Sequence, residues 1–207
     1  MALDLERLIH EQAARKLELD RFGTYFLGRI DDEEAERFSK ALIVMAGMRA
    51  GARAEDKQLN VYINSGGGSV GAGFAMMEMM YRVKRDFGIR IRTVITGYAY
   101  SMGAILVQAG DCRVMGKYST LMLHSGSWMI AGEDQRVFED YRKLSDHYKA
   151  LIGGMFADRT GRRDARWWIR YIYSGHDRFL SAQECLKLGL IDVVTDETYN
   201  DSVVCTP

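Results

Sequence analysis

The stretch around which this sequence is organised reads Gly97-Tyr98-Ala99-Tyr100-Ser101-Met102-Gly103-Ala104-Ile105-Leu106-Val107. The apolar run 91–95 before it is typical of a buried β-strand, and the residues that follow Ser101 are typical of a short helix. We therefore expect a strand, a turn of small residues and a helix over 101–109. Such a turn presents the serine hydroxyl beside helix N-terminal N–H groups that can bind an oxyanion. The alternative is that Ser101 is only the helix N-cap, a common role for serine.

The composition excludes several classes of protein. The chain has 207 residues, of which 47% are hydrophobic and 27% charged, enough for one large domain or two small ones. Its 28 basic and 28 acidic residues cancel, whereas nucleic-acid-binding domains usually carry a basic excess. No apolar run approaches the roughly 20 residues that cross a bilayer, and the N-terminus has no secretory signal pattern. We expect a cytoplasmic protein with neither nucleic acid nor membrane as a partner.

The cysteines indicate neither a metal site nor a disulfide framework. There are three, Cys112, Cys185 and Cys205, which are widely spaced and odd in number. No CxxC pair is present, and such pairs are typical of structural zinc sites. We therefore expect three reduced thiols and no bound metal.

Strand-like and helix-like patterns alternate three times, over 24–48, 59–83 and 89–109. This alternation predicts right-handed βαβ units and a parallel sheet, hence an α/β fold. Further along, we expect short strands, helices and a last strand, over 113–115, 120–124, 133–155, 163–172, 181–188 and 191–194. We predict an N-terminal arm (1–21), one domain (22–195) with an excursion over about 125–160, and a C-terminal tail (196–207).

A glycine-rich turn, Ser65-Gly66-Gly67-Gly68-Ser69, separates the second predicted strand from its helix. A turn of this kind can bind a phosphate at the helix N-terminus, although the GxxxxGK[ST] and GxGxxG spacings are both absent. Three glycines also let the backbone approach an extended peptide or direct an N–H group at a reaction centre. The alternative is a tight turn without a further role.

Two more residues have the chemistry of a serine hydrolase. His124 ends a short apolar strand and enters the loop Ser125-Gly126-Ser127, where it could act as a general base or be an ordinary hydrogen-bonded histidine. Asp177 precedes a predicted capping box formed by Ser181 and Glu184. It could orient a histidine by accepting its Nδ1–H. The alternatives are a pair with Arg178 or a plain turn aspartate.

Taken together, these motifs resemble the ClpP family, the proteolytic subunits of ATP-dependent Clp proteases, within the crotonase-like superfamily. The resemblance covers about residues 22–195. It rests on motifs in the family's order, namely Phe26-Leu27-Gly28-Arg29-Ile30-Asp31-Asp32, Tyr62-Ile63-Asn64-Ser65, Gly67-Gly68-Ser69-Val70, Ala99-Tyr100-Ser101-Met102-Gly103-Ala104, Leu121-Met122-Leu123-His124, Asp177-Arg178-Phe179-Leu180-Ser181-Ala182 and Gly189-Leu190-Ile191-Asp192.

The resemblance implies a serine endopeptidase that hydrolyses peptides and unfolded proteins. Ser101 is similar to the family's nucleophile, His124 to its base and Asp177 to the carboxylate that holds the histidine. Gly68 and Met102 match the positions whose N–H groups form the oxyanion hole. Substrate would bind as an added β-strand, and the substrate-binding residues would be Gly67, Ser69, Val70 and Ser125.

The resemblance also implies an assembly. The long helix over 133–155 is similar to the family's handle helix, through which two seven-membered rings stack into a barrel. A Clp-type AAA+ ATPase is the implied partner. ATP would be used by that partner, so that this chain itself would need no cofactor.

The chain departs from the family pattern at three places. Gly66 replaces the usual proline before the Gly-Gly pair, Ser125-Gly126 replaces the usual Gln-Pro after the histidine, and Gly175-His176 replaces the usual Asp-Arg pair before the aspartate. Three alternatives therefore accompany the main interpretation. They are a related serine peptidase with another assembly or partner (phage-encoded or signal-peptide-peptidase-like), a non-catalytic ring subunit, and a crotonase-type acyl-CoA enzyme.

Overall fold

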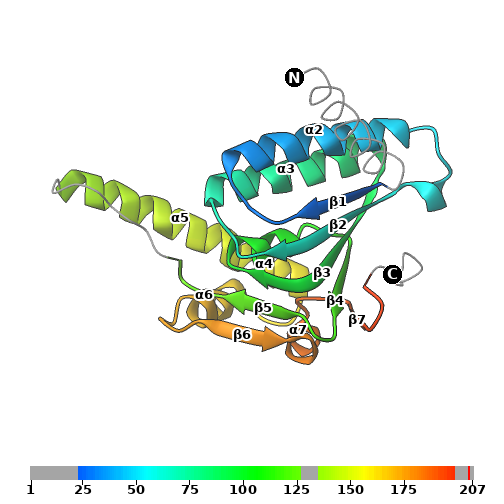
Figure 1. The fold of residues 1–207 in the computed structure, drawn as a ribbon. Helices are drawn as coiled ribbons and strands as arrows, with labels where there is room; N and C mark the ends of the chain where they lie inside the picture. Colours follow the sequence, from blue (N-terminus) through cyan, green and yellow to red (C-terminus); the bar gives the residue numbers. More distant parts are fainter. Residues whose placement is uncertain (1–22, 127–134, 199–204, 206–207) are drawn as a thin grey trace, which may run out of the picture.

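The computed structural model describes residues 23–126, 135–198 and 205. Five parallel strands form the main sheet in the order β1 (Thr24–Leu27), β2 (Gln58–Ser65), β3 (Arg90–Tyr100), β4 (Cys112–Gly116) and β7 (Val193–Thr195). Two short strands extend it where β3 runs beyond β4 (Figure 1). β5 (Thr120–Leu123) pairs with β3 in parallel, and β6 (Arg178–Ser181) pairs with β5 in antiparallel orientation. The predicted α/β fold with a parallel sheet is confirmed.

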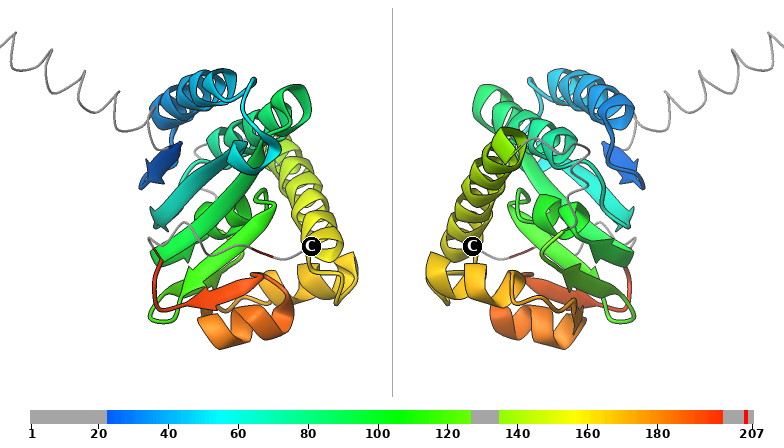
Figure 2. Two further views of the ribbon diagram at one scale, coloured as in Figure 1. Left: turned by 90° about the vertical axis from the view of Figure 1, so that its right-hand side faces the viewer. Right: turned by 90° about the vertical axis from the view of Figure 1, so that its left-hand side faces the viewer.

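The first two helices follow β1 and β2 and lie side by side on one face of the sheet (Figure 2). In α2 (Asp32–Met48), Asp31 is the N-cap, and its side chain accepts a hydrogen bond from the Glu34 N–H at 2.8 Å. In α3 (Val70–Phe87), the Ser69 side chain accepts from the Ala72 N–H at 3.3 Å. A short 3₁₀ turn, η1 (Ala54–Asp56), lies in the loop between α2 and β2.

The main core lies between this face of the sheet and the helices α2, α3 and α4 (Met102–Val107). Methionines fill much of it, and six of the chain's 12 methionines are buried there (Met45, Met76, Met77, Met80, Met102 and Met115), since the flexible thioether side chain fills irregular gaps. Gly73 in α3 contacts Met102 so closely that a Cβ there would lie 2.3 Å from the methionine side chain. Other fully buried members are Phe38, Leu42, Met45, Leu59, Ile63, Met76, Met80 and Ile91.

The first turns of the long helix α5 (Gln135–Thr160) project beyond the sheet (Figure 1), and its last turns pack against α6 (Ala165–Ile172). α5 and α6 meet where Gly153 faces Ile169, and a Cβ at Gly153 would lie 2.5 Å from that side chain. The rings of Phe156 and the fully buried Trp168 lie 5.0 Å apart in the same contact. The predicted excursion over 125–160 therefore packs against the rest of the domain through the C-terminal part of α5.

The chain closes with α7 (Ala182–Leu188), which begins at the predicted capping box. The Ser181 N–H donates to Glu184 Oε2 at 2.9 Å, and the Glu184 N–H donates to Ser181 Oγ at 3.4 Å. After α7, Asp192 forms a bidentate salt bridge with Arg113 on β4. Arg113 Nε donates to Asp192 Oδ2 at 3.0 Å, and Arg113 Nη2 donates to Asp192 Oδ1. This contact fastens the start of β7 to β4.

Several predicted boundaries are wrong. β3 continues to Tyr100 instead of ending at Ile95, because its last residues pair with β5. The β6 strand was not predicted. It has only four residues, too few to show an alternating apolar pattern, and it is defined by its pairing with β5. α3 runs on to Phe87, and α5 runs on to Thr160. The predicted arm over 1–21 lies outside the described residues.

No helix in the described ranges is both long and apolar enough to cross a membrane.

The expectation of three reduced thiols is also wrong. Cys112 and Cys205 form a disulfide, with their Cα atoms 5.4 Å apart, while Cys185 is free and buried. The partners are 93 residues apart in the sequence, so spacing gave no indication of the bond. They meet on the sheet face opposite α2 and α3. There Cys205 packs against a small apolar cluster whose buried members are Tyr62, Val94, Cys112 and Val114.

We predict that this disulfide stabilises the fold measurably. Reduction should lower the free energy of unfolding by about 2–4 kcal/mol, because a crosslink over a long loop restricts the unfolded chain. Urea denaturation with and without a thiol reductant measures the difference. The Cys205→Ser variant serves as the control. Its free energy of unfolding should equal that of the reduced wild type and should not change when the reductant is added. Identical denaturation midpoints for oxidised and reduced wild type would contradict the prediction.

Candidate active site

The pairing of β5 brings three residues from distant parts of the chain to one place. On one side Met122 pairs with Tyr100, and on the other Leu123 pairs with Arg178. Ser101 follows Tyr100 directly, His124 follows Leu123, and Asp177 precedes Arg178. Since residues next to a paired position remain neighbours, the three side chains gather at the end of β5.

Ser101 has an uncommon backbone conformation. It has φ of 54°, and it is the only non-glycine residue with positive φ in the described part of the chain. Such a conformation costs about 1–3 kcal/mol and persists only where the surroundings enforce it. Here the Ser101 N–H donates to the Met122 carbonyl at 2.9 Å. On the other side Gly67 lies so close that a Cβ there would be 2.7 Å from the Ser101 Cβ.

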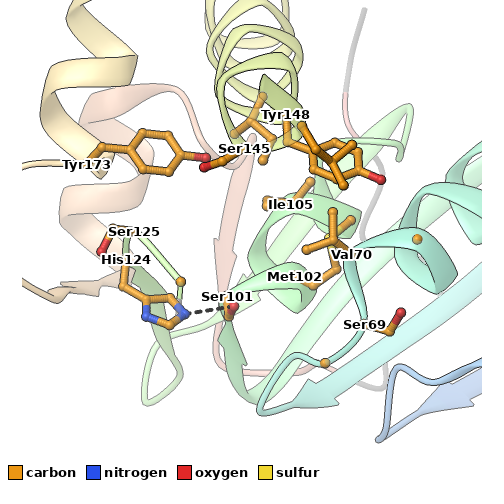
Figure 3. Close-up of a pocket in the computed structure, with 15 residues that line it drawn as sticks. Ser69, Val70, Ser101, Met102, Ile105, His124, Ser125, Ser145, Tyr148 and Tyr173 are labelled. Atoms are coloured by element: carbon orange, nitrogen blue, oxygen red, sulfur yellow. Dashed lines mark hydrogen bonds between the residues drawn. The ribbon is translucent and has the colours of Figure 1, made fainter. Parts of the chain in front are cut away.

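The Ser101 hydroxyl does not cap the helix that it precedes. Ser101 occupies the N-cap position of α4, but its side chain makes no capping hydrogen bond. Its Oγ lies 2.8 Å from Nε2 of His124 instead (Figure 3). The capping alternative is therefore wrong, and the hydroxyl is in hydrogen-bond contact with an imidazole.

His124 and Asp177 are close but not hydrogen-bonded. Nδ1 of His124 lies 3.9 Å from Oδ1 of Asp177, which exceeds hydrogen-bond length. The histidine side chain is 26% exposed and the aspartate 57%. Arg178 is not paired with Asp177 in the described structure. It donates to Ser174 Oγ at 3.0 Å, and its guanidinium lies 5.0 Å from the centre of the Tyr171 ring.

The glycine-rich turn passes beside Ser101, and its middle residues need to be glycine. Gly67 has φ of 95° and Gly68 has φ of 151°. A Cβ at Gly68 would lie 2.0 Å from the Ile30 carbonyl oxygen, which also accepts a hydrogen bond from the Ser69 N–H at 2.8 Å. Met102 begins α4, so its N–H has no acceptor within the helix. The turn and the helix start therefore flank the serine with backbone N–H groups.

A cavity of about 450 Å³ opens at Ser101, between α4, the glycine-rich turn and α5 (Figure 3). Of the residues predicted to bind substrate, Ser69, Val70 and Ser125 line it, as do Gly68, Ser101, Met102 and His124. Gly67 does not, because it lies behind Ser101. The lining residues that the structure describes include no Asp, Glu, Lys or Arg, so this part of the cavity suits an uncharged group.

The far wall of the cavity consists of residues that sequence reasoning missed. From α5 come Leu144, Ser145, Tyr148 and Ile152, from α4 comes Ile105, and Tyr173 follows α6. The four-residue spacing of Leu144, Tyr148 and Ile152 marks one face of a helix and could have indicated them. Burial raises the pKa of the Tyr173 phenol to about 12, so this hydroxyl is protonated at neutral pH.

The described residues do not form a metal site. No group of three or more His, Cys, Asp or Glu side chains within these ranges is arranged to hold an ion. The polar side chains described near Ser101, which include His124, Ser69 and Ser125, are instead suited to transfer a proton or to form hydrogen bonds.

Comparison with known proteins identifies the family. The Clp protease family model matches residues 14–198. The chain is 33% identical over 195 residues to the "ATP-dependent Clp protease proteolytic subunit 2" of Thermobifida fusca (strain YX), covering 92% of this chain and 88% of the relative. It is 31% identical over 179 residues to the "ATP-dependent Clp protease proteolytic subunit" of Chara vulgaris, covering 83% of this chain and 74% of the relative.

The family match extends over most of the chain and includes every residue of the site, from the glycine-rich turn to Asp177. The predicted resemblance is thus confirmed, and the chain belongs to the Clp protease family, a family of serine-type endopeptidases.

Proposed function

We propose that this chain cleaves peptide bonds with Ser101 as its nucleophile. The observation that carries the proposal is the 2.8 Å contact between Ser101 Oγ and His124 Nε2 at the mouth of a cavity. A serine hydroxyl is weakly nucleophilic unless a base accepts its proton. The backbone conformation of Ser101 supports the same role, since strained residues concentrate at functional sites.

The proposed reaction proceeds in two stages. Ser101 Oγ attacks the scissile carbonyl carbon while His124 Nε2 takes the hydroxyl proton. The tetrahedral intermediate then collapses, and His124 returns that proton to the amine that leaves. Water attacks the resulting ester by the reverse sequence, so that the acid product departs and Ser101 regains its proton.

The N–H groups of Gly68 and Met102 are the proposed donors to the oxyanion. Both belong to backbone beside the Ser101 side chain, and that of Met102 is free of helical hydrogen bonding. The third member of the triad is Asp177, whose carboxylate would hold the Nδ1–H of His124. Because these atoms are 3.9 Å apart, a small movement of either side chain is required to form this hydrogen bond.

Substrate is proposed to lie along the glycine-rich turn as an added strand, with Gly67, Ser69, Val70 and Ser125 around the scissile bond. Gly67 shapes this path from behind Ser101 instead of lining the cavity.

We further propose that the chain works as two stacked heptameric rings with a Clp-type AAA+ ATPase in the cytoplasm. ATP would serve the partner, and this chain would need no cofactor. The relatives named as proteolytic subunits of ATP-dependent proteases support this proposal. So do large apolar side chains exposed on the projecting helix α5, which mark a contact surface. They are Val137, Phe138, Tyr141, Leu144 and Leu151.

Replacement of Ser101 by alanine tests the nucleophile. The variant should lose at least about 10⁴-fold in peptidase kcat, since loss of the nucleophile removes the covalent route. A fluorophosphonate probe should label the wild type at Ser101 and leave Ser101→Ala unlabelled, as read by peptide mass spectrometry. Labelling that persists in the variant would rule out Ser101.

A matched pair of glycine substitutions tests the oxyanion hole. In Gly68→Ala the new Cβ meets the Ile30 carbonyl, so the N–H of residue 68 must move and kcat should fall by about 100-fold or more. Gly66→Ala adds the same methyl group in open space and should leave kcat within about twofold. Circular dichroism should show that both variants are folded. Equal kcat values for the two would contradict the assignment of Gly68.

The assembly is tested by native mass spectrometry. The 23.5 kDa chain should appear as a complex of 14 copies or as rings of seven. Phe138→Glu, on the exposed face of α5, should shift the population from 14 copies to seven by placing a charge in the contact between rings. A wild type that remains a monomer at micromolar concentration would contradict the proposal.

A further inference from the structure

The side of the cavity away from Ser101 is polar at one point. Figure 3 shows the Tyr173 side chain pointing toward Ser145, across the cavity from Ser101 and His124. Tyr173 is held there because it caps the C-terminus of α6, with its N–H donating to the Ile169 carbonyl at 2.9 Å. Ser145 belongs to α5, against which α6 packs. Two hydroxyl groups thus face one another on a firmly packed pair of helices.

Within residues 23–126, 135–198 and 205, the hydroxyl groups of Tyr173 and Ser145 have no hydrogen-bond partner. The Tyr173 ring packs against the main core and lies near Lys149, whose Nζ is 5.7 Å from the ring centre. A tyrosine phenol is protonated at neutral pH, and burial raises the pKa of Tyr173 further, to about 12. Both groups can therefore donate or accept one hydrogen bond to a ligand.

The walls between Ser101 and these hydroxyls are apolar. Met102 and Ile105 contribute from α4, and Tyr148 and Ile152 from α5, with the Tyr148 ring stacked on Phe74 at 5.5 Å. A flat, apolar group fits between such walls, and the lack of charged side chains among the described lining residues disfavours an ionised tip. The cavity thus has an apolar region and a neutral hydrogen-bonding end. These match the aromatic ring and the hydroxyl group of a tyrosine side chain.

We propose that Tyr173 and Ser145 form the polar end of the pocket for the substrate residue that precedes the scissile bond. They hydrogen-bond the tip of that side chain, so that tyrosine is preferred to phenylalanine at this position. This inference rests on the proposed function, since the cavity is a substrate pocket only if Ser101 is the nucleophile.

The preference is measured with two fluorogenic peptides that differ only in tyrosine or phenylalanine before the cleaved bond. The wild type should show a kcat/KM about three to ten times higher for the tyrosine peptide, the value of one net hydrogen bond. In Tyr173→Phe this ratio should fall toward one while kcat/KM for the phenylalanine peptide stays within about twofold. Ser145→Ala should lower the ratio in the same direction.

Tyr118→Phe is the matched control, because Tyr118 is 89% exposed and does not line the cavity. It loses the same hydroxyl and should keep the wild-type ratio. A wild-type ratio near one, or a ratio that neither Tyr173→Phe nor Ser145→Ala lowers, would overturn the proposal. If Tyr173→Phe does not fold, the wild type and Ser145→Ala still decide.

A binding measurement separates failure of this inference from failure of the proposed function. Acetylated tripeptide acids ending in tyrosine or phenylalanine correspond to the product and need no nucleophile to bind. Their Kd values for Ser101→Ala, measured by calorimetry, should differ threefold to tenfold in favour of tyrosine. Equal Kd values overturn the specificity. Tyrosine-selective binding by a protein in which Ser101 resists the fluorophosphonate probe supports the pocket and contradicts the nucleophile.

Discussion

The site depends on β5 being paired on both edges. On one edge β5 continues the parallel sheet along the end of β3, and on the other it forms an antiparallel pair with β6. A shift of one residue in either register would turn every side chain of a strand to the opposite face. His124 would then point away from Ser101, or Asp177 away from His124. The distance between the Ser101 and His124 side chains is therefore set by the backbone hydrogen bonds that pair β5 with its neighbouring strands.

The strained backbone of Ser101 is a second constraint of the same kind. Its positive φ turns the hydroxyl out of the helix-capping position and toward His124. The conformation is enforced from both sides, by the hydrogen bond to Met122 and by the close approach of Gly67. The glycine-rich turn therefore has two structural duties, since Gly67 leaves room for the serine and Gly68 leaves room for Ile30.

Local features of this chain could be predicted from the sequence, and features that depend on distant pairing could not. The caps at Asp31 and Ser181 and the alternation of strand and helix were predictable because their patterns span a few residues. Ser101 and His124 were identified by their place in ordered motifs, and the structure brings them together. The extension of β3 was missed because only β5 explains it. The same holds for Tyr173, which reaches the cavity through the packing of α6 on α5.

The disulfide divides the chain into a covalently closed ring and an open part. Cys112 and Cys205 enclose His124, Asp177 and the helix α5, whereas Ser101 and the glycine-rich turn lie outside the ring. The two halves of the site thus belong to different topological segments. A proteolytic cut anywhere between the two cysteines would leave both fragments linked, and they would separate only after reduction. The histidine and the serine would therefore remain in one covalently linked molecule after a cut between residues 112 and 124.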